Sequence, residues 1–336
     1  MTGTININQA YMRRYDYQYF KPGPMNLQPA ISTPPDRSQL AVGALLVAGL
    51  LWGLTWIPLK YFGSRGLNGI TLTMMSYGLV GLLALPWILY RRKTWWPQRR
   101  LVLMIAIAGG LANVCFLSAI IRGEVVRVML LFYLAPVWGV LGGRIFFGEP
   151  LTRLRIFGVA TAVVGAVLLL GGPALLAAPP GVVDLLALAS GMLYASQNLV
   201  TRAADRTPLD TKSLVVFVGC GLLSSIIVLG TGEPLPDIEP PLLGQLFAFA
   251  GIWMLAAMVV TAWGVSHLEA GRAAILLVFE LVAAVISAMW IAGERLDGLE
   301  WIGAAMIVAA ALLEARPSKK SRDSLSPQRI LHNTPR

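Results

Sequence analysis

The sequence predicts an all-α integral membrane protein, with ten transmembrane helices arranged as two inverted five-helix repeats. The chain is 56% hydrophobic and only 13% charged, with a mean hydropathy of +0.68, whereas soluble domains are about 25% charged. Its apolar residues gather in segments long enough to cross a bilayer. In addition, residues 122–168 match residues 267–313 without a gap, 145 positions further along the chain. Such internal symmetry is common in membrane transporters.

The apolar segments are expected to be spans because about 20 apolar residues cover the ~30 Å hydrocarbon core of a bilayer. Ten segments meet this requirement, at residues 40–62, 69–90, 101–121, 125–147, 153–172, 181–201, 213–230, 242–265, 271–292 and 298–315. They predict two domains, a first repeat over residues 40–172 and a second over residues 181–315.

The two ends of the chain are polar. Residues 1–38 are rich in proline and contain no apolar signal-peptide core, so they are predicted to be a disordered cytoplasmic tail. Met25 is a candidate for the true start of the protein. Residues 316–336 are predicted to be a second, basic cytoplasmic tail.

The positive residues predict the orientation. With the N-terminus inside, 22 of the 27 lysines and arginines fall on the inner side, and five fall on the outer side. This bias indicates a multi-pass protein of the cell (inner or plasma) membrane with both termini in the cytoplasm. Each half has an odd number of spans, so the second half crosses in the opposite sense and the repeat is inverted.

The same arrangement accounts for the net charge of +10. The positive residues lie between apolar segments, so a nucleic-acid partner is not expected.

Cys115 and Cys220 lie inside apolar runs with no second ligand nearby, so neither a disulfide framework nor a metal site is predicted. No cofactor is expected. The phosphate-binding pattern Gly-x-x-x-x-Gly-Lys-[Ser/Thr] is absent from the sequence, which argues against direct use of ATP.

The repeat contains two corners, Gly148-Glu149 and Gly293-Glu294. In each, glycine is expected to end one helix, and the acid is expected to face the positive end of the next helix. They are therefore predicted to be structural corners. Contact with substrate is the alternative interpretation.

Glu280 lies near the middle of the ninth predicted span. An acid at this depth costs about 2.5–3.5 kcal/mol on insertion scales, so a functional role is the default interpretation. Lys60 and Arg127 are expected near the outer face and Arg272 near the inner face, too far away to pair with it. An unpaired carboxyl in a low dielectric favours its neutral form. The hypothesis is that Glu280 binds a proton and couples it to transport; the alternative is a permanently protonated side chain bonded to a neighbouring helix.

Trp52, Trp56 and Lys60 are spaced four residues apart, on one face of the first span. They are candidates for a cavity that accepts a planar organic anion or a zwitterion by stacking and charge. The alternative is that the tryptophans pack against lipid or helices and that Lys60 reaches to the outer interface.

A second group of pathway candidates is polar or aromatic. Tyr194, Gln197 and Asn198 share roughly one face of the sixth span. Weaker candidates come from the third, fourth and eighth spans: Asn113, Tyr133 and Trp263. Hydrogen bonding between helices is the alternative role.

Several short motifs, in order, resemble the drug/metabolite transporter superfamily, and specifically its EamA-like ten-helix transporters. In the first half they are Leu51-Trp52-Gly53 with Lys60, Leu134-Ala135-Pro136-Val137, Gly148-Glu149 and Gly158. In the second half they are Gly181 to Arg202 with Asp184 and Tyr194, Phe279-Glu280-Leu281-Val282, Gly293-Glu294 and Gly303. The family usually has Glu-Pro where this chain has Glu280-Leu281, so the proline kink expected there is absent.

This resemblance implies a secondary transporter that exports a small organic metabolite, such as an amino-acid-like compound, or an amphipathic toxin. Its pathway would lie between the halves, lined by spans 1, 3, 4, 6, 8 and 9, with alternating access and with protons as the candidate coupling ion. An importer and a channel or scaffold are alternatives. A membrane enzyme is not expected, because no convergent catalytic set is evident. The lipid bilayer and a small molecule are the expected partners; the substrate's identity and the oligomeric state stay open.

Overall fold

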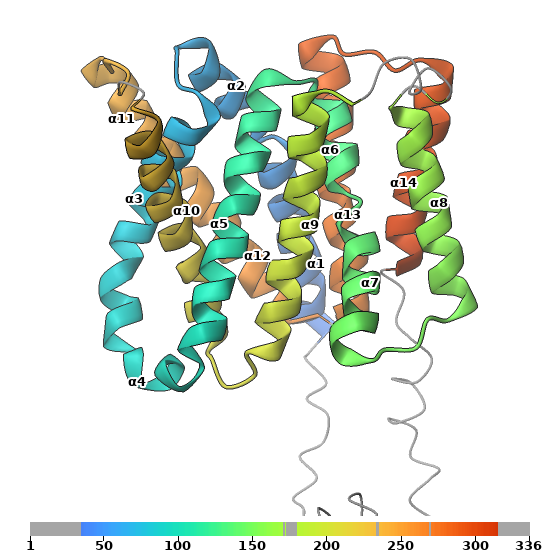
Figure 1. The fold of residues 1–336 in the computed structure, drawn as a ribbon, viewed down its shortest axis with the longest axis horizontal. Helices are drawn as coiled ribbons and strands as arrows, with labels where there is room; N and C mark the ends of the chain where they lie inside the picture. Colours follow the sequence, from blue (N-terminus) through green and yellow to red (C-terminus); the bar gives the residue numbers. More distant parts are fainter. Residues whose placement is uncertain (1–34, 171, 173–179, 233–234, 269, 315–336) are drawn as a thin grey trace, which may run out of the picture.

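The computed structural model describes residues 35–170, 172, 180–232, 235–268 and 270–314, which form a bundle of helices without a strand in this part of the chain (Figure 1). Of the predicted tails, residues 1–34 and 316–336 lie outside the described residues. The first helix begins at Pro35, inside the predicted tail. Proline suits the first position of a helix, and Asp36 suits the first turn, which explains the earlier start.

The helices follow the predicted spans. Their order is α1 (Pro35–Gly53), α2 (Trp56–Ser64), α3 (Gly69–Tyr90), α4 (Arg92–Trp95), η3 (Trp96–Gln98), α5 (Arg99–Arg122), α6 (Val125–Phe132), α7 (Ala135–Phe147), α8 (Arg153–Leu169), α9 (Val182–Ala203), α10 (Leu209–Thr231), α11 (Pro240–Ala248), η5 (Phe249–Met254), α12 (Leu255–Ser266), α13 (Ala270–Ser287), η6 (Ala288–Ala292) and α14 (Gly298–Glu314). The segments η5 and η6 are π-helical turns.

Seven helical stretches of the described residues are long and apolar enough to cross a membrane: Gln39–Ser64, Gly69–Tyr90, Arg92–Arg122, Val125–Phe147, Leu209–Thr231, Pro240–Ser266 and Ile275–Ala292. Helices α8 and α14 have 17 residues each. Helix α9 has 22 residues, with Asp184 and Arg202 near its two ends. The chain is therefore a multi-pass, all-helical membrane protein.

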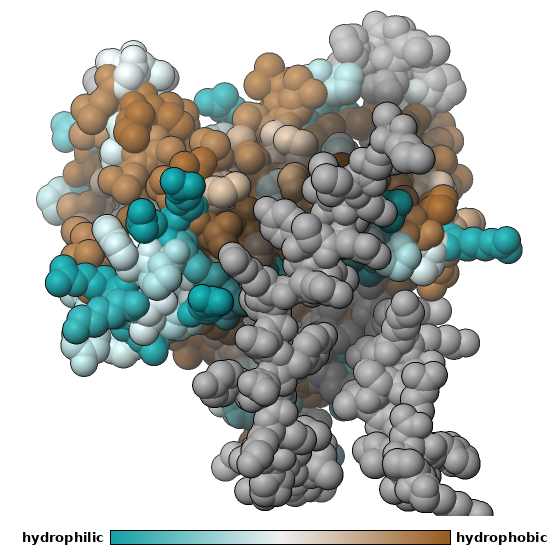
Figure 2. Space-filling model, turned by 60° about the horizontal axis from the view of Figure 1, so that its bottom comes forward, coloured by the Kyte–Doolittle hydropathy of each residue, from teal (hydrophilic) through white to brown (hydrophobic). Residues whose placement is uncertain are grey.

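The bundle has two ends, which we call upper and lower as in Figure 1. The upper end carries α2 and the beginning of α6; the lower end carries α4 and the end of α7. Hydrophobic residues dominate the sides of the molecule, and hydrophilic ones gather at the lower end where α4 lies (Figure 2). The exposed apolar side chains include Leu82, Leu229 and Trp290. A belt of this kind is what contact with lipid requires.

The helices pack in a defined pattern of pairs. Helix α3 packs along α10 on one side of the bundle, and α8 packs along α14 on the opposite side (Figure 1). Between these pairs, α5 packs along α9, and α1 packs along α12 and α13. The central helices are therefore flanked by two outer pairs.

The first and fourth predicted spans are each divided into two helices. The regular α-helical hydrogen bonding is interrupted at Leu54 and Thr55, between α1 and α2, and again at Tyr133 and Leu134, between α6 and α7. The N–H groups of Thr55 and Leu134 bind the carbonyl three residues earlier instead of four. A proline follows each break, Pro58 in α2 and Pro136 in α7. Proline lacks the N–H that would complete the preceding turn, so a helix breaks just before it.

The equivalent position in the second half behaves differently. Leu281 lies 145 residues after Pro136, and α13 passes through it as a continuous helix. The absence of a kink at Glu280-Leu281, expected from the missing proline, is what the structure shows. This helix is thus interrupted in the first copy of the repeat and continuous in the second.

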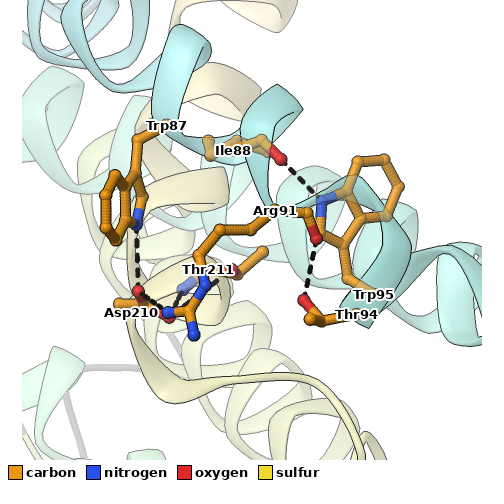
Figure 3. A network of polar contacts seen from close by, with 7 residues as sticks. All are labelled: Trp87, Ile88, Arg91, Thr94, Trp95, Asp210 and Thr211. Atoms are coloured by element: carbon orange, nitrogen blue, oxygen red, sulfur yellow. Dashed lines mark hydrogen bonds and ion pairs between the residues drawn. The ribbon is translucent and has the colours of Figure 1, made fainter.

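At the lower end, the outer pair of α3 and α10 is joined by a polar network (Figure 3). The Asp210 carboxylate accepts a hydrogen bond from Trp87 Nε1 (2.9 Å) and forms an ion pair with Arg91. It also accepts from the backbone N of Thr211 (2.7 Å), in the first turn of α10. Trp95 Nε1 donates to the carbonyl oxygen of Ile88 (2.8 Å). Amphipathic tryptophans beside arginines are typical of the membrane interface.

The contact between α5 and α10 depends on the absence of a side chain at Gly219. A Cβ at this position would lie 2.0 Å from the carbonyl oxygen of Ala106, which cannot move without moving α5. We expect Gly219→Ala to destabilise the purified protein by about 1–3 kcal/mol through overpacking. The melting temperature in detergent measures this loss.

Gly230 supplies the matched control, because it lies in the same helix and a Cβ there would meet nothing within 4 Å. Gly230→Ala should leave the melting temperature unchanged or raise it slightly. Equal melting temperatures for the two variants would contradict this packing of α5 on α10.

Candidate functional site

A cavity of about 810 Å³ occupies the lower half of the bundle, between the central helices. Its lining on α9 runs from Tyr194 to Arg202, which lies in the last turn of that helix, and the lining also includes Leu209, where α10 begins. Along α6 and α7, the lining begins only at Phe132. The cavity therefore reaches the lower rim and stops near the middle of the bundle.

Glu280 lies in the wall of this cavity, on α13. Its carboxyl group is close enough to the hydroxyls of Tyr77, Tyr133 and Tyr194 to interact with each electrostatically. The Tyr133 hydroxyl also donates to the carbonyl oxygen of Leu277 (3.3 Å). These tyrosines come from α3, from the break between α6 and α7, and from α9. One carboxyl group and three hydroxyls therefore share the wall of the cavity.

The backbone of α1 approaches Glu280 closely. A Cβ at Gly53 would lie 2.7 Å from the Glu280 carbonyl oxygen. This contact fixes the distance between α1 and α13 and brings Trp52 to the cavity. Trp52 Nε1 donates to Thr261 Oγ1 (3.0 Å) on α12, which orients the indole ring.

The wall opposite α13 is aromatic and amide-rich. The ring of Phe132 lies 5.0 Å from Phe116, 5.8 Å from Tyr133 and 5.3 Å from Tyr194, measured between ring centres. Of the predicted pathway candidates, seven line the cavity: Trp52, Asn113, Tyr133, Tyr194, Gln197, Asn198 and Glu280. Aromatic rings, tilted or edge-on to one another, and amides suit a small organic molecule with flat apolar and polar parts.

Three predicted candidates lie elsewhere in the structure. Trp56 is buried, with its Nε1 donating to Ser287 Oγ (2.9 Å), and Lys60 Nζ donates to the Gly123 carbonyl oxygen at the upper end. Trp263 stacks on His267, with ring centres 4.5 Å apart. The break at Leu54 and Thr55 ends the continuous stripe expected from the spacing, so only Trp52 reaches the cavity.

The upper end of the bundle is sealed by polar contacts. Arg127 on α6 binds Asp184 on α9 through two hydrogen bonds (2.7 and 3.1 Å). Arg127 Nη1 also lies 3.8 Å from a carboxylate oxygen of Glu300 on α14. The Glu294 carboxylate accepts hydrogen bonds from the backbone N of Val125 (2.7 Å) and Val126 (2.8 Å), where α6 begins.

At the lower end, Glu149 has different partners. Its carboxylate forms ion pairs with Arg202 and with Arg155 (2.9 Å). Hydrogen bonds from Arg202 and then Arg155 hold the pKa of Glu149 below its usual value. The corner thus stays anionic well into the acidic range.

Neither acid caps the helix that follows it, in contrast to the sequence expectation. The start of α8 is capped by Thr152, whose side chain accepts from Arg155 N (3.3 Å), and α8 begins at Arg153, so Pro150 lies before the helix. Glu294 does cap a helix, but this helix is α6 in the other half of the chain. Sequence spacing could not reveal a partner about 170 positions away.

The sequence analysis did not single out five polar members of the cavity lining for this role: Thr55, Tyr77, Arg202, Ser213 and Thr261. Among the described residues that line the cavity, Glu280 and Arg202 are the charged ones, and Arg202 is already paired with Glu149. Within the described residues, no group of three His, Cys, Asp or Glu side chains is placed to hold a metal ion.

A multi-pass helical bundle with a cavity that is open at one end and sealed at the other defines a membrane transport protein by its architecture. The model of the EamA-like transporter family matches the chain twice, at residues 39–171 and 181–315. The chain therefore belongs to the EamA-like transporter family, and it is a transporter rather than an enzyme.

Several curated relatives carry transporter names. One is an "Uncharacterized transporter" of Archaeoglobus fulgidus, 25% identical, covering 81% of this chain and 95% of the relative. Another is a "Riboflavin transporter" of Rhizobium johnstonii, 24% identical, covering 86% and 95%. A third is a "Probable terminal-alkyne amino-acid exporter" of Streptantibioticus cattleyicolor, 26% identical, covering 86% and 98%. These names fit the wider drug/metabolite transporter superfamily.

The fold also occurs among solved structures. A crystal structure matches with a TM-score of 0.51 and 18% sequence identity, covering 86% of this chain and 99% of the matched chain. At this identity, the likeness concerns the fold alone.

The cavity predicts a pattern of thiol reactivity. In a background with Cys115→Ala and Cys220→Ala, we expect Ser213→Cys, in the cavity lining, to react quickly with a charged, water-soluble maleimide. Ser190→Cys, at a position on α9 with 0% exposure, should react at least about tenfold more slowly, because such a reagent labels only water-accessible thiols. Labelling in native membranes, followed by mass spectrometry, measures both rates. Slow labelling of both positions would mean that the cavity does not reach the lower rim.

Proposed function

We propose that this protein is a secondary active transporter that exports a small organic molecule by alternating access, in exchange for protons. The substrate class is a small metabolite, such as an amino-acid-like compound, or an amphipathic toxin. The observation that carries the proposal is the cavity, which has a carboxyl group, three tyrosine hydroxyls and aromatic rings in its wall. Its volume of about 810 Å³ suits a molecule of this size.

The relatives support a small organic substrate. Their names include a riboflavin transporter and an amino-acid exporter. Riboflavin has a flat ring system, and amino acids carry an ammonium group and a carboxylate. Amides, aromatic faces and a carboxyl group can bind such groups by hydrogen bonds, ring contacts and charge, in a cavity without bulk water.

The transport mechanism requires two structurally related halves, and we propose residues 40–172 and 181–315 as the two five-helix repeats. The seven long apolar stretches, together with α8, α9 and α14, would make ten spans. If the two halves change places, α3 takes the position of α10 and α8 takes the position of α14. The packed pair α5–α9 then takes the position of the packed pair α12–α1. All four pairs are packed together, as a two-fold axis in the membrane plane would require.

We propose that the lower end faces the cytoplasm of a cell whose inner or plasma membrane holds the protein. The connections at the lower end carry many basic residues: Arg91, Arg92, Lys93, Arg99, Arg100, Arg144, Arg153, Arg155, Arg202, Arg206 and Lys212. This follows the positive-inside rule and would put both termini in the cytoplasm. The open cavity would then accept substrate from inside, the direction that export needs.

Glu280 is the proposed proton carrier. It has no cation beside it in the cavity lining except Arg202, which is held by Glu149 at the rim. A carboxyl group without a permanent cationic partner can release its proton when a substrate group binds beside it, and surrounding hydroxyls can then donate hydrogen bonds to the carboxylate. Binding would therefore be linked to protonation.

The proposal is tested by comparing metabolites released by cells that express the wild type, Glu280→Gln or an empty vector. We expect one compound class to accumulate in the medium with the wild type only. Glu280→Gln should reduce its export by about tenfold or more, the equivalent of at least ~1.4 kcal/mol in the rate-limiting barrier. It should also remove the dependence of export on an imposed pH gradient.

Glu239→Gln is the matched control, because it makes the same chemical change at an exposed position before α11. It should export like the wild type at equal membrane levels. Export and pH response that survive in Glu280→Gln would exclude proton coupling through this residue. Depletion of a compound from the medium by the wild type would instead indicate import.

A further inference from the structure

The two corners of the repeat have the same backbone geometry. Gly148 and Gly293 both adopt the left-handed conformation, with φ of +66° and +71°. The N–H of Glu149 donates to the Gly143 carbonyl (3.2 Å), and that of Glu294 donates to the Ala288 carbonyl (3.4 Å). The two donor residues are 145 positions apart in the sequence, and so are the two acceptor residues. The backbone therefore presents the two carboxylates in equivalent ways, one at each end of the bundle.

The side chains of the two corners nevertheless bind different groups. At the sealed end, Glu294 binds the backbone N of positions 125 and 126, the first two residues of α6. The equivalent positions, 270 and 271, are the first two residues of α13. At the open end, however, Glu149 binds the side chains of Arg155 and Arg202.

A second equivalent pair differs in the same way. Lys60 and Arg202 each lie 21 residues after the first residue of the two matched segments, which begin at 39 and 181. At the sealed end, Lys60 binds the carbonyl oxygen of Gly123, just before α6. At the open end, Arg202 binds the acidic corner instead. The two ends therefore hold equivalent groups in two different arrangements.

We infer that Glu149 and Glu294 are positioning residues of a two-ended gate, and that each closes its own end by binding the first backbone amides of a helix in the opposite half. In the present arrangement, Glu294 holds α6 and the upper end is closed. In the opposite arrangement, Glu149 leaves its arginines and binds the start of α13, and Glu294 leaves α6. The inference rests on the proposed inverted repeat and alternating access.

The energetics favour exchange between the two arrangements. A carboxylate that accepts two backbone N–H bonds is held firmly, because charge-assisted hydrogen bonds are about twice as strong as neutral ones. The pair between Arg202 and Glu149 is weaker, since the Arg202 side chain is 59% exposed. Glu149 would also leave Arg155, and the two backbone N–H groups at the start of α13 would offset both losses.

The ends are not equally balanced. A released Glu149 has two bases, Arg155 and Arg202, whereas the residue equivalent to Arg155 in the second half is Glu300. A released Glu294 would therefore meet Glu300, an acid of its own charge, at the position where Glu149 meets Arg155, and the bases near it, Lys60 and Arg127, already bind other groups. This difference favours the arrangement with the lower end open, which is the one observed.

The test uses two reporters that occupy equivalent positions. Ser213 lines the open cavity, and Thr71, which lies equally far along the first matched segment, is 3% exposed near the upper end. Each is replaced by cysteine in the background lacking Cys115 and Cys220. A charged maleimide is then applied from either side of sealed membrane vesicles.

We expect Glu294→Gln to raise the labelling rate of Thr71→Cys by about tenfold or more, because a charge-assisted interaction that keeps the upper end closed is lost. Glu149→Gln should lower the same rate, because it removes the interaction that holds the opposite arrangement. The variant with both changes should return towards the wild-type rate. Glu239→Gln should change nothing.

Opposite shifts that cancel in the double variant cannot come from a purely structural role, which would reduce folded protein in every case. The inference is overturned if Thr71 labelling is unchanged in Glu294→Gln, or if both single variants shift it in the same direction. If Glu294→Gln does not fold, Glu149→Gln alone must still lower the rate. Absence of export by the wild type would reject the proposed function, while the labelling pattern is read independently of any substrate.

Discussion

A chain in a bilayer must satisfy its backbone hydrogen bonds within the protein, because hydrocarbon offers no partners. This constraint applies most severely where helices break. Between α1 and α2, Trp253 Nε1 donates to the carbonyl oxygen of Leu51 and to Thr55 Oγ1, both at 3.1 Å. At the beginning of α6, Glu294 accepts from two free N–H groups. The breaks persist because side chains from distant helices complete them.

The same breaks create the cavity. Thr55 lies in the break between α1 and α2, and Tyr133 lies in the break between α6 and α7; both line the cavity wall. An interrupted helix exposes polar backbone and changes the direction of its side chains, so polar groups converge at mid-depth. On the facing side, α13 is continuous and contributes the carboxyl group of Glu280. The site thus combines two interrupted helices with one continuous helix.

The pairing of helices explains how such a bundle can move without losing its packing. The contact between α5 and α10 depends on Gly219, where the backbones almost touch, so these helices are expected to move together. The polar contacts at the two ends are of another kind, because in the proposed mechanism they exchange partners. Rigid packing in the interior and exchangeable polar contacts at the rims are the two properties that alternating access needs.

The sequence by itself determined the helical membrane class, the approximate helix bounds and the family resemblance, because hydropathy and repeat spacing are local properties. It also identified Glu280 and six further side chains of the cavity lining. Tertiary structure decided that Trp56 and Lys60 lie outside the cavity, because the break after Gly53 ends the regular helical spacing. It also decided that Glu294 binds α6 and that Glu149 binds arginines. Identical motifs cannot reveal this difference, because the partners are set by which helices pack beside each corner.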